Sequence, residues 1–252
     1  MSDQNLAPAD DSAPLALPPE KASVVEDFID IFYAPAAVFA RRATGNFWIP
    51  MLVVSVLIGA VFMATRGITR PIMDAEMARA EAAQLKANPQ LTPEQLSVGR
   101  SMQDKIAPFA AFLFPPIGIL FVALTLWLVG KAVGATQSWN AALVVASYAY
   151  VLKPLEAFVG GAQAMLMNPA SLDGRLRVTL GVGRFFDPQT ASPVLLAAIG
   201  RLDIFTLWMT ALLAIGLSVT GKISRREGAI AAALVWVVGA IPGVIGAVMQ
   251  SR

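Results

Sequence analysis

Cysteine and histidine are both absent from the 252 residues of this chain. Without cysteine there is no disulfide, thiolate nucleophile, zinc-thiolate site or iron-sulfur cluster. Without histidine, the usual general base and the commonest transition-metal ligand are missing as well. The remaining Asp, Glu, Lys, Ser and Tyr residues show no paired catalytic arrangement. We therefore expect a protein with no enzymatic activity, no cofactor and no metal site.

Charged residues are also scarce, at 14% of the chain, with 19 basic and 17 acidic residues and a net charge of +2. The basic residues are scattered through loops and form no strip with interleaved aromatics, so nucleic acid is not an expected partner. By contrast, 56% of residues are hydrophobic and the mean hydropathy is +0.64. A water-soluble surface cannot carry so many apolar residues, and we predict an integral membrane protein whose first partner is the lipid bilayer.

Five apolar runs each have about the 20 residues that are needed to cross about 30 Å of hydrocarbon. They cover residues 47–64, 107–129, 139–167, 204–220 and 229–249. The prediction is an all-α, multi-pass membrane protein with five transmembrane helices and short interfacial helices. Residues 46–250 form the membrane domain.

The N-terminal part divides into two predicted segments. Residues 1–23 read as a disordered tail, with neither the basic start nor the apolar core of a signal peptide. Residues 24–45 predict two short amphipathic helices that lie at the interface or against a partner. The first helix would have an apolar stripe and an opposite acidic face, made respectively of Val24, Val25, Phe28, Ile29 and Phe32 and of Glu26, Asp27 and Asp30.

Two polar regions interrupt the membrane domain. Residues 71–105 are rich in helix formers and contain a stop at Asn88-Pro89 and a cap at Thr92, which predicts a helical hairpin outside the bilayer. Residues 176–182 alternate between apolar residues and polar residues or Gly, which predicts a small β-hairpin at the interface.

Loop charges predict the orientation. Lys222, Arg225 and Arg226 make the densest short basic loop, which places the turn between the last two spans, and with it the N-terminus, in the cytoplasm. The first and third loops hold more basic residues in total. We give the short loop more weight, because long loops cross the membrane with less regard for charge.

Two pairs of ionisable residues lie near or within the spans. Lys153 and Glu156 are three residues apart and share a helix face, so they form either a functional polar site inside the membrane or an ion pair at the outer interface. Asp203 either caps the fourth span or faces an interior cavity together with Arg201. For both pairs the purely structural reading is the favoured one.

The order of features resembles the Yip family (Ypt/Rab-interacting proteins) in its bacterial branch, over roughly residues 28–245. The resemblance rests on the amphipathic entry with Phe32, Pro35 and Phe39, on Trp48-Ile49-Pro50 at the first span, and on residues 146–149, 202–208 and 212–217. It implies an all-helical membrane domain with a cytoplasmic N-terminus. Eukaryotic members are associated with vesicle trafficking and small GTPase binding. The short tail of Asp, Ala and Pro departs from their pattern.

These patterns favour a membrane organiser or adaptor that binds lipids, other membrane proteins or further copies of itself. Its candidate contact residues are Phe28, Phe32, Pro35 and Phe39, and its expected location is the bacterial cytoplasmic membrane. The alternative is a small transporter or channel with a polar path along Lys153, Glu156, Arg201 and Asp203. An intramembrane enzyme ranks third.

Overall fold

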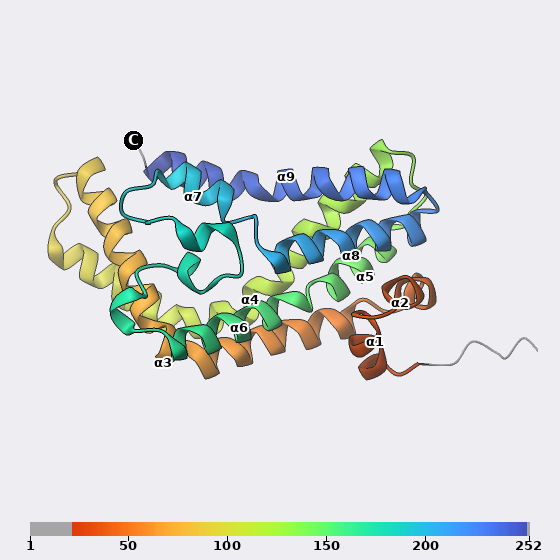
Figure 1. Cartoon of the computed structure of the whole chain (residues 1–252), viewed down its shortest axis with the longest axis horizontal. Coiled ribbons are helices and arrows are strands. Elements are labelled where there is room, and N and C mark those ends of the chain that lie inside the picture. The colour runs from red at the N-terminus through yellow and green to blue at the C-terminus, as the bar shows by residue number, and fades with distance from the viewer. Residues whose placement is uncertain (1–21, 251–252) are drawn as a thin grey trace, which may run out of the picture.

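The computed structural model describes residues 22–250 and places them in an elongated bundle of helices (Figure 1). The predicted tail therefore lies almost entirely outside the described residues. The elements follow in the order α1 (Val24–Asp30), α2 (Pro35–Arg42), α3 (Trp48–Ala87), α4 (Pro93–Ala132), α5 (Trp139–Ala149), α6 (Leu152–Leu166), the 3-10 turns η1 (Pro169–Ser171), η2 (Arg175–Val178) and η3 (Val182–Phe185), and then α7 (Pro193–Ile199), α8 (Ile204–Gly221) and α9 (Arg225–Gln250).

Five helical segments are long and apolar enough to span a membrane: α3, α4, α5 with α6, α8 and α9. This confirms the predicted fold class. Helices α3 and α4 have 40 residues each, so each is about 60 Å long, twice the thickness of the hydrocarbon core. Both therefore extend well beyond one face of a bilayer. The polar residues 71–105 form this extension, in which the end of α3 and the start of α4 run antiparallel.

Proline does not break these two long helices. Pro71 lies inside α3, and Pro108, Pro115 and Pro116 lie inside α4. Pro108, Pro115 and Pro116 lie in the second span, and transmembrane helices tolerate proline because neighbouring helices and local adjustments satisfy the freed carbonyls. Pro71 lies at the base of the extension, where α4 packs alongside α3. The hairpin is thus a continuation of two membrane helices, and Thr92 caps α4 at its tip by accepting a hydrogen bond from the Gln95 amide.

The third span is divided between α5 and α6 at Tyr150 and Val151. Helix α5 is the most enclosed helix of the described chain, since it packs against α4 on one side and α8 on another, and all residues from Ala141 to Ala149 are buried. Its position in the centre of the core explains its small residues. At Gly216 of α8, an added Cβ would lie 2.4 Å from Val145 of α5, so the two helices approach closely there.

Helices α1 and α2 pack on one end of the bundle, beside α5 and α8 (Figure 1). The predicted acidic face of α1 is wrong at one position: Asp27 is fully buried, whereas Val25 and Ile29 of the predicted apolar stripe are exposed. The helix is rotated from the predicted orientation because two arginines of α2 provide Asp27 with charged partners inside the fold.

The predicted β-hairpin at 176–182 is also wrong. The segment forms the turns η2 and η3, and a single isolated bridge joins Gly181 to Asp203. Local polar bonds explain the difference, because Arg177 donates two hydrogen bonds to Asp173 and a third to the carbonyl of Arg184. These bonds fold the segment on itself, which prevents a two-stranded ladder.

Candidate functional site

The most deeply buried ion-paired group in the described chain is the Asp27 carboxylate. Its side chain is 0% exposed. Nε of Arg41 donates to Oδ1 at 2.6 Å, Nε of Arg42 donates to Oδ2 at 2.5 Å, and the hydroxyl of Tyr148 donates to Oδ2 at 3.0 Å. A buried carboxylate is stable only when it is paired and hydrogen-bonded, and Asp27 meets both conditions.

The arginines extend this site to its rim. Nη2 of Arg41 also binds Asp30, at 2.5 Å, and Nη2 of Arg42 donates to the carbonyl of Ala22. Partial burial lowers the pKa of Arg41, but its hydrogen bonds to Asp30 and Asp27 outweigh that effect and raise the pKa. Arg41 stays charged at physiological pH. Together these contacts form a clasp, consisting of Asp27, Arg41, Arg42 and Tyr148, that joins α1, α2 and α5.

The aromatic residues predicted to bind a partner contact the chain itself. Phe28 packs against Tyr148 at a centroid distance of 5.3 Å, and Phe32 meets Trp208 of α8 edge-on at 5.4 Å. Phe39 is fully buried in the core, and Pro35 is the first residue of α2. The three phenylalanines therefore hold α1 and α2 on the bundle, and Pro35 starts α2.

A different set of apolar side chains in this segment faces outward. Val25, Ile29 and Tyr33 are 70%, 56% and 84% exposed. They are spaced four residues apart, so they form one row along α1 and the turn that follows it. We call these three residues the outer row. The clasp fixes α1 from its opposite face and thereby sets the direction in which the outer row points.

Lys153 and Glu156 lie on α6 and form an ion pair in which Nζ of Lys153 is 2.8 Å from Oε2 of Glu156. Both side chains are about one third exposed, at 32% and 28%. The structure thus brings these two predicted residues together.

Arg201 and Asp203 lie between α7 and α8 and act separately. Arg201 donates to the carbonyls of Trp236 at 2.8 Å and Gly239 at 3.3 Å on α9, and its guanidinium stacks on the Trp236 ring at 5.4 Å. Asp203 caps α8, because its Oδ1 accepts from the amide of Phe205 at 2.8 Å. Within residues 22–250, neither residue is ion-paired to the other or to the pair on α6.

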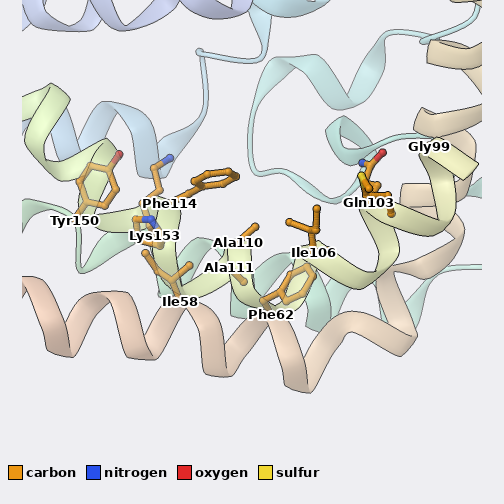
Figure 2. Close-up of a pocket in the computed structure, with 13 residues that line it drawn as sticks. Ile58, Phe62, Gly99, Gln103, Ile106, Ala110, Ala111, Phe114, Tyr150 and Lys153 are labelled. Atoms are coloured by element: carbon orange, nitrogen blue, oxygen red, sulfur yellow. The ribbon is translucent and has the colours of Figure 1, made fainter.

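A groove of about 750 Å³ runs along α4 between the hairpin and the third span (Figure 2). Its walls are mainly apolar, with Ile58 and Phe62 from α3 and Ile106 and Phe114 from α4. Gln103 and Gly99 lie toward one end of it, and Tyr150 and Lys153 toward the other (Figure 2). This volume is in the range of ligand sites in proteins.

Sequence reasoning missed the clasp. An acidic residue in an amphipathic helix is normally assigned to the solvent face, and the partners of Asp27 are 14, 15 and 121 residues away. One signal was available in the sequence. Asp27 lies three residues after Val24 and four before Ile31, so it shares a helix face with apolar side chains, and two adjacent arginines, Arg41 and Arg42, follow on a second short helix. A buried ion pair between the two helices fits that pattern.

Comparison with known proteins identifies the family. A family model of the Yip1 domain matches residues 29–246, which is most of the chain and nearly all of the helical bundle. Searches of curated proteins and of solved structures gave no significant match. The matched segment begins within α1 and ends in α9, so it includes Arg41, Arg42 and Tyr148 of the clasp but not Asp27. It also includes the outer row from Ile29 onward and the five spans, except for the last residues of α9. The chain belongs to the Yip1 domain family of multi-pass membrane proteins.

Proposed function

We propose that this protein is a non-enzymatic membrane organiser or adaptor, and that it binds other membrane proteins through the outer row of α1. The supporting observation is the combination of a buried clasp with three exposed apolar side chains on the opposite face of the same short helix and of the turn that follows it. A seven-residue helix is too short to be stable by itself in water. The clasp keeps it folded and oriented, which lowers the entropy cost of docking a partner.

The outer row suits a helical partner. Side chains at positions i, i+4 and i+8 make a narrow stripe of the kind that packs against another helix. Charged groups border this stripe on one side, where Glu26 and Asp30 follow Val25 and Ile29 on the helix. A polar edge beside an apolar centre is common in protein interfaces.

The ionisable groups near the spans support a structural role for these residues and not a polar path of a transporter or channel. Lys153 and Glu156 neutralise each other, Arg201 is bound to carbonyls of α9, and Asp203 caps α8. Partners of this kind lower the cost of a charge at membrane depth. The composition also supports a role without catalysis, since the chain has no cysteine and no histidine.

We also propose that the protein lies in a bacterial cytoplasmic membrane with its N-terminus in the cytoplasm. Support comes from the short loop between α8 and α9, where Lys222, Arg225 and Arg226 lie at the same end of the bundle as α1 and α2 (Figure 1). Short basic loops remain on the cytoplasmic side.

The test is site-specific photo-crosslinking in native membranes. A photoreactive amino acid at Ile29 should give a discrete protein adduct, and the two substitutions Val25→Ser and Tyr33→Ser in the same chain should reduce that adduct at least tenfold. A photoreactive residue at Ala36, which is exposed on α2, is the matched control and should give no such adduct. Substituting Lys153→Ala together with Glu156→Ala should leave the adduct unchanged.

Two results would count against the adaptor role. Adducts with lipid alone at Ile29 would show that the outer row is a membrane anchor. Equal protein adducts at Ile29 and Ala36 would show contacts without a specific surface.

A further inference from the structure

The groove along α4 begins at the level where the bilayer ends. In α4, no charged residue lies between Lys105 and Lys131. In α3, the first charged residue is Arg66. The two helices are in register there, because Nη2 of Arg66 donates to the carbonyl of Asp104 at 3.1 Å. Charged residues avoid the hydrocarbon core, so this level marks the membrane surface.

The depth of the groove can be measured from that surface. Along α4 it extends to Pro115, ten residues past Lys105, which corresponds to about 15 Å. On the other wall, Gly161 of α6 lies directly against Thr65 of α3, next to the surface level. Lys153 is eight residues deeper than Gly161, or about 12 Å. Both values match one leaflet, which is half of a hydrocarbon core of about 30 Å.

The surface end of the groove is polar and carries excess positive charge. A smaller hollow of about 410 Å³, lined in part by Ser101 and Lys105, shares Met102 with the groove. Lys105 has no ion-pair partner in the described part of the chain. Near Lys105, where the hairpin leaves the spans, three arginines contact two aspartates. The arginines are Arg66, Arg70 and Arg100, and the aspartates are Asp74 and Asp104.

We infer that the groove binds one anionic phospholipid, with its phosphate at Lys105 and Ser101 and an acyl chain along the apolar walls toward Lys153. The length of the groove, its apolar walls and the cation at its surface end each match a part of that ligand. Lys153 lies at the inner end of the groove (Figure 2). Its side chain is paired with Glu156, and this charged pair ends the apolar path. This inference rests on the membrane placement in the proposed function and adds a ligand class to it.

The experiment uses the full chain in nanodiscs with a trace of phosphatidylglycerol that carries a diazirine in its acyl chain. After irradiation, labelled residues are mapped by peptide mass spectrometry. Phosphatidylcholine with the same labelled chain is the comparison lipid. We expect adducts concentrated on groove residues such as Phe62 and Phe114, and several times more of them with phosphatidylglycerol than with phosphatidylcholine.

Two pairs of variants test the two parts of the site. Ala111→Trp fills the groove and should reduce groove adducts at least tenfold, whereas Leu128→Trp, on the exposed surface of α4 outside the groove, should leave them unchanged. Lys105→Gln should lower the preference for phosphatidylglycerol about fivefold, the effect of one basic residue at an anionic surface. Lys86→Gln, which removes the same charge at the hairpin tip, should have no effect.

Adducts spread evenly over all lipid-facing residues of the unmodified chain would overturn the inference, and this map decides the question even if Ala111→Trp fails to fold. Equal labelling by the two lipids would overturn the anionic headgroup. The protein adduct at Ile29 is measured in separate samples and does not depend on the groove. Loss of lipid labelling with an intact Ile29 adduct would therefore refute the lipid site alone.

Discussion

Removing the charge of Asp27 should release α1 from the bundle without unfolding the protein. In Asp27→Asn the side chain keeps its shape, but Arg41 and Arg42 lose their buried anion and Tyr148 loses a charged acceptor. Breaking a buried pair by removing one partner costs about 3–5 kcal/mol. Because the two arginines are 26% and 28% exposed and can regain water, we expect about 3 kcal/mol.

The absence of cysteine makes this release measurable. A single Ile31→Cys substitution places a thiol at the C-cap of α1, where the native side chain is fully buried, so a maleimide reacts only when the helix detaches. A loss of about 3 kcal/mol corresponds to labelling that is about a hundredfold faster in Asp27→Asn. A thiol at Ala142, buried in α5, should keep its slow labelling rate, because the bundle itself stays folded.

The matched control is Asp30→Asn. Asp30 also pairs with Arg41, at 2.5 Å, but its side chain is 39% exposed. A pair of this kind contributes at most about 1 kcal/mol, so labelling at Ile31→Cys should rise less than about fivefold. If Asp27→Asn and Asp30→Asn had equal effects, or if the thiol at Ala142 reacted as fast as the one at Ile31, the reasoning about a local buried clasp would be refuted.

Two further predictions concern packing and pH. Gly216→Ala should lower the thermal unfolding midpoint in detergent by several degrees, because the new Cβ would lie 2.4 Å from Val145, whereas Gly243→Ala, which meets no atom within 4 Å, should leave it unchanged or raise it. An equal effect at both glycines would contradict the close approach of α5 and α8. The hydrogen bond from Arg177 lowers the pKa of Asp173, so this pair stabilises the loop above about pH 4 and the stabilisation is lost as the pH falls through the lowered pKa. In limited proteolysis by pepsin, residues 168–192 of the native chain should be cut more slowly than those of Asp173→Asn near pH 4, and this difference should disappear as the pH falls through the lowered pKa. Comparing the two chains at each pH cancels the pH dependence of the protease itself, and a native-to-variant ratio that does not change with pH would contradict this assignment.

The membrane architecture could be predicted from sequence because each span corresponds to an apolar run, and only the third run is interrupted by charged residues. Residues such as Trp48, Lys131 and Trp139 mark the ends of these runs, and the interruption near Lys153 corresponds to the division between α5 and α6. The course of α3 and α4 through their prolines was harder to predict. Proline breaks helices in water, and only the neighbouring helices of the bundle show that it is tolerated at Pro71 and Pro108.

The clasp could not be predicted from the sequence, because the burial of Asp27 is stabilised by residues that are distant along the chain. Periodicity assigns Asp27 to the exposed face of α1, and only the packing of α2 against α5 brings Arg42 and Tyr148 to the same point. The same rotation of α1 packs Phe28 partly against the core and exposes Val25, although both belong to one apolar stripe in the sequence. Burial of a residue in a short amphipathic helix is therefore set by its partners.

The central claim is that the polar residues near the spans hold the fold and do not line a conduit. Single cysteines at Lys153, Glu156 and Asp203, with Ser224→Cys as the topology control, can be treated with a membrane-impermeant maleimide from each side of sealed vesicles. We predict that the thiol at Ser224 reacts from the cytoplasmic side only, and that the other three react from the opposite side alone or remain unlabelled. Labelling at Lys153 and Glu156 from both sides would contradict the claim and indicate an alternating water-filled path.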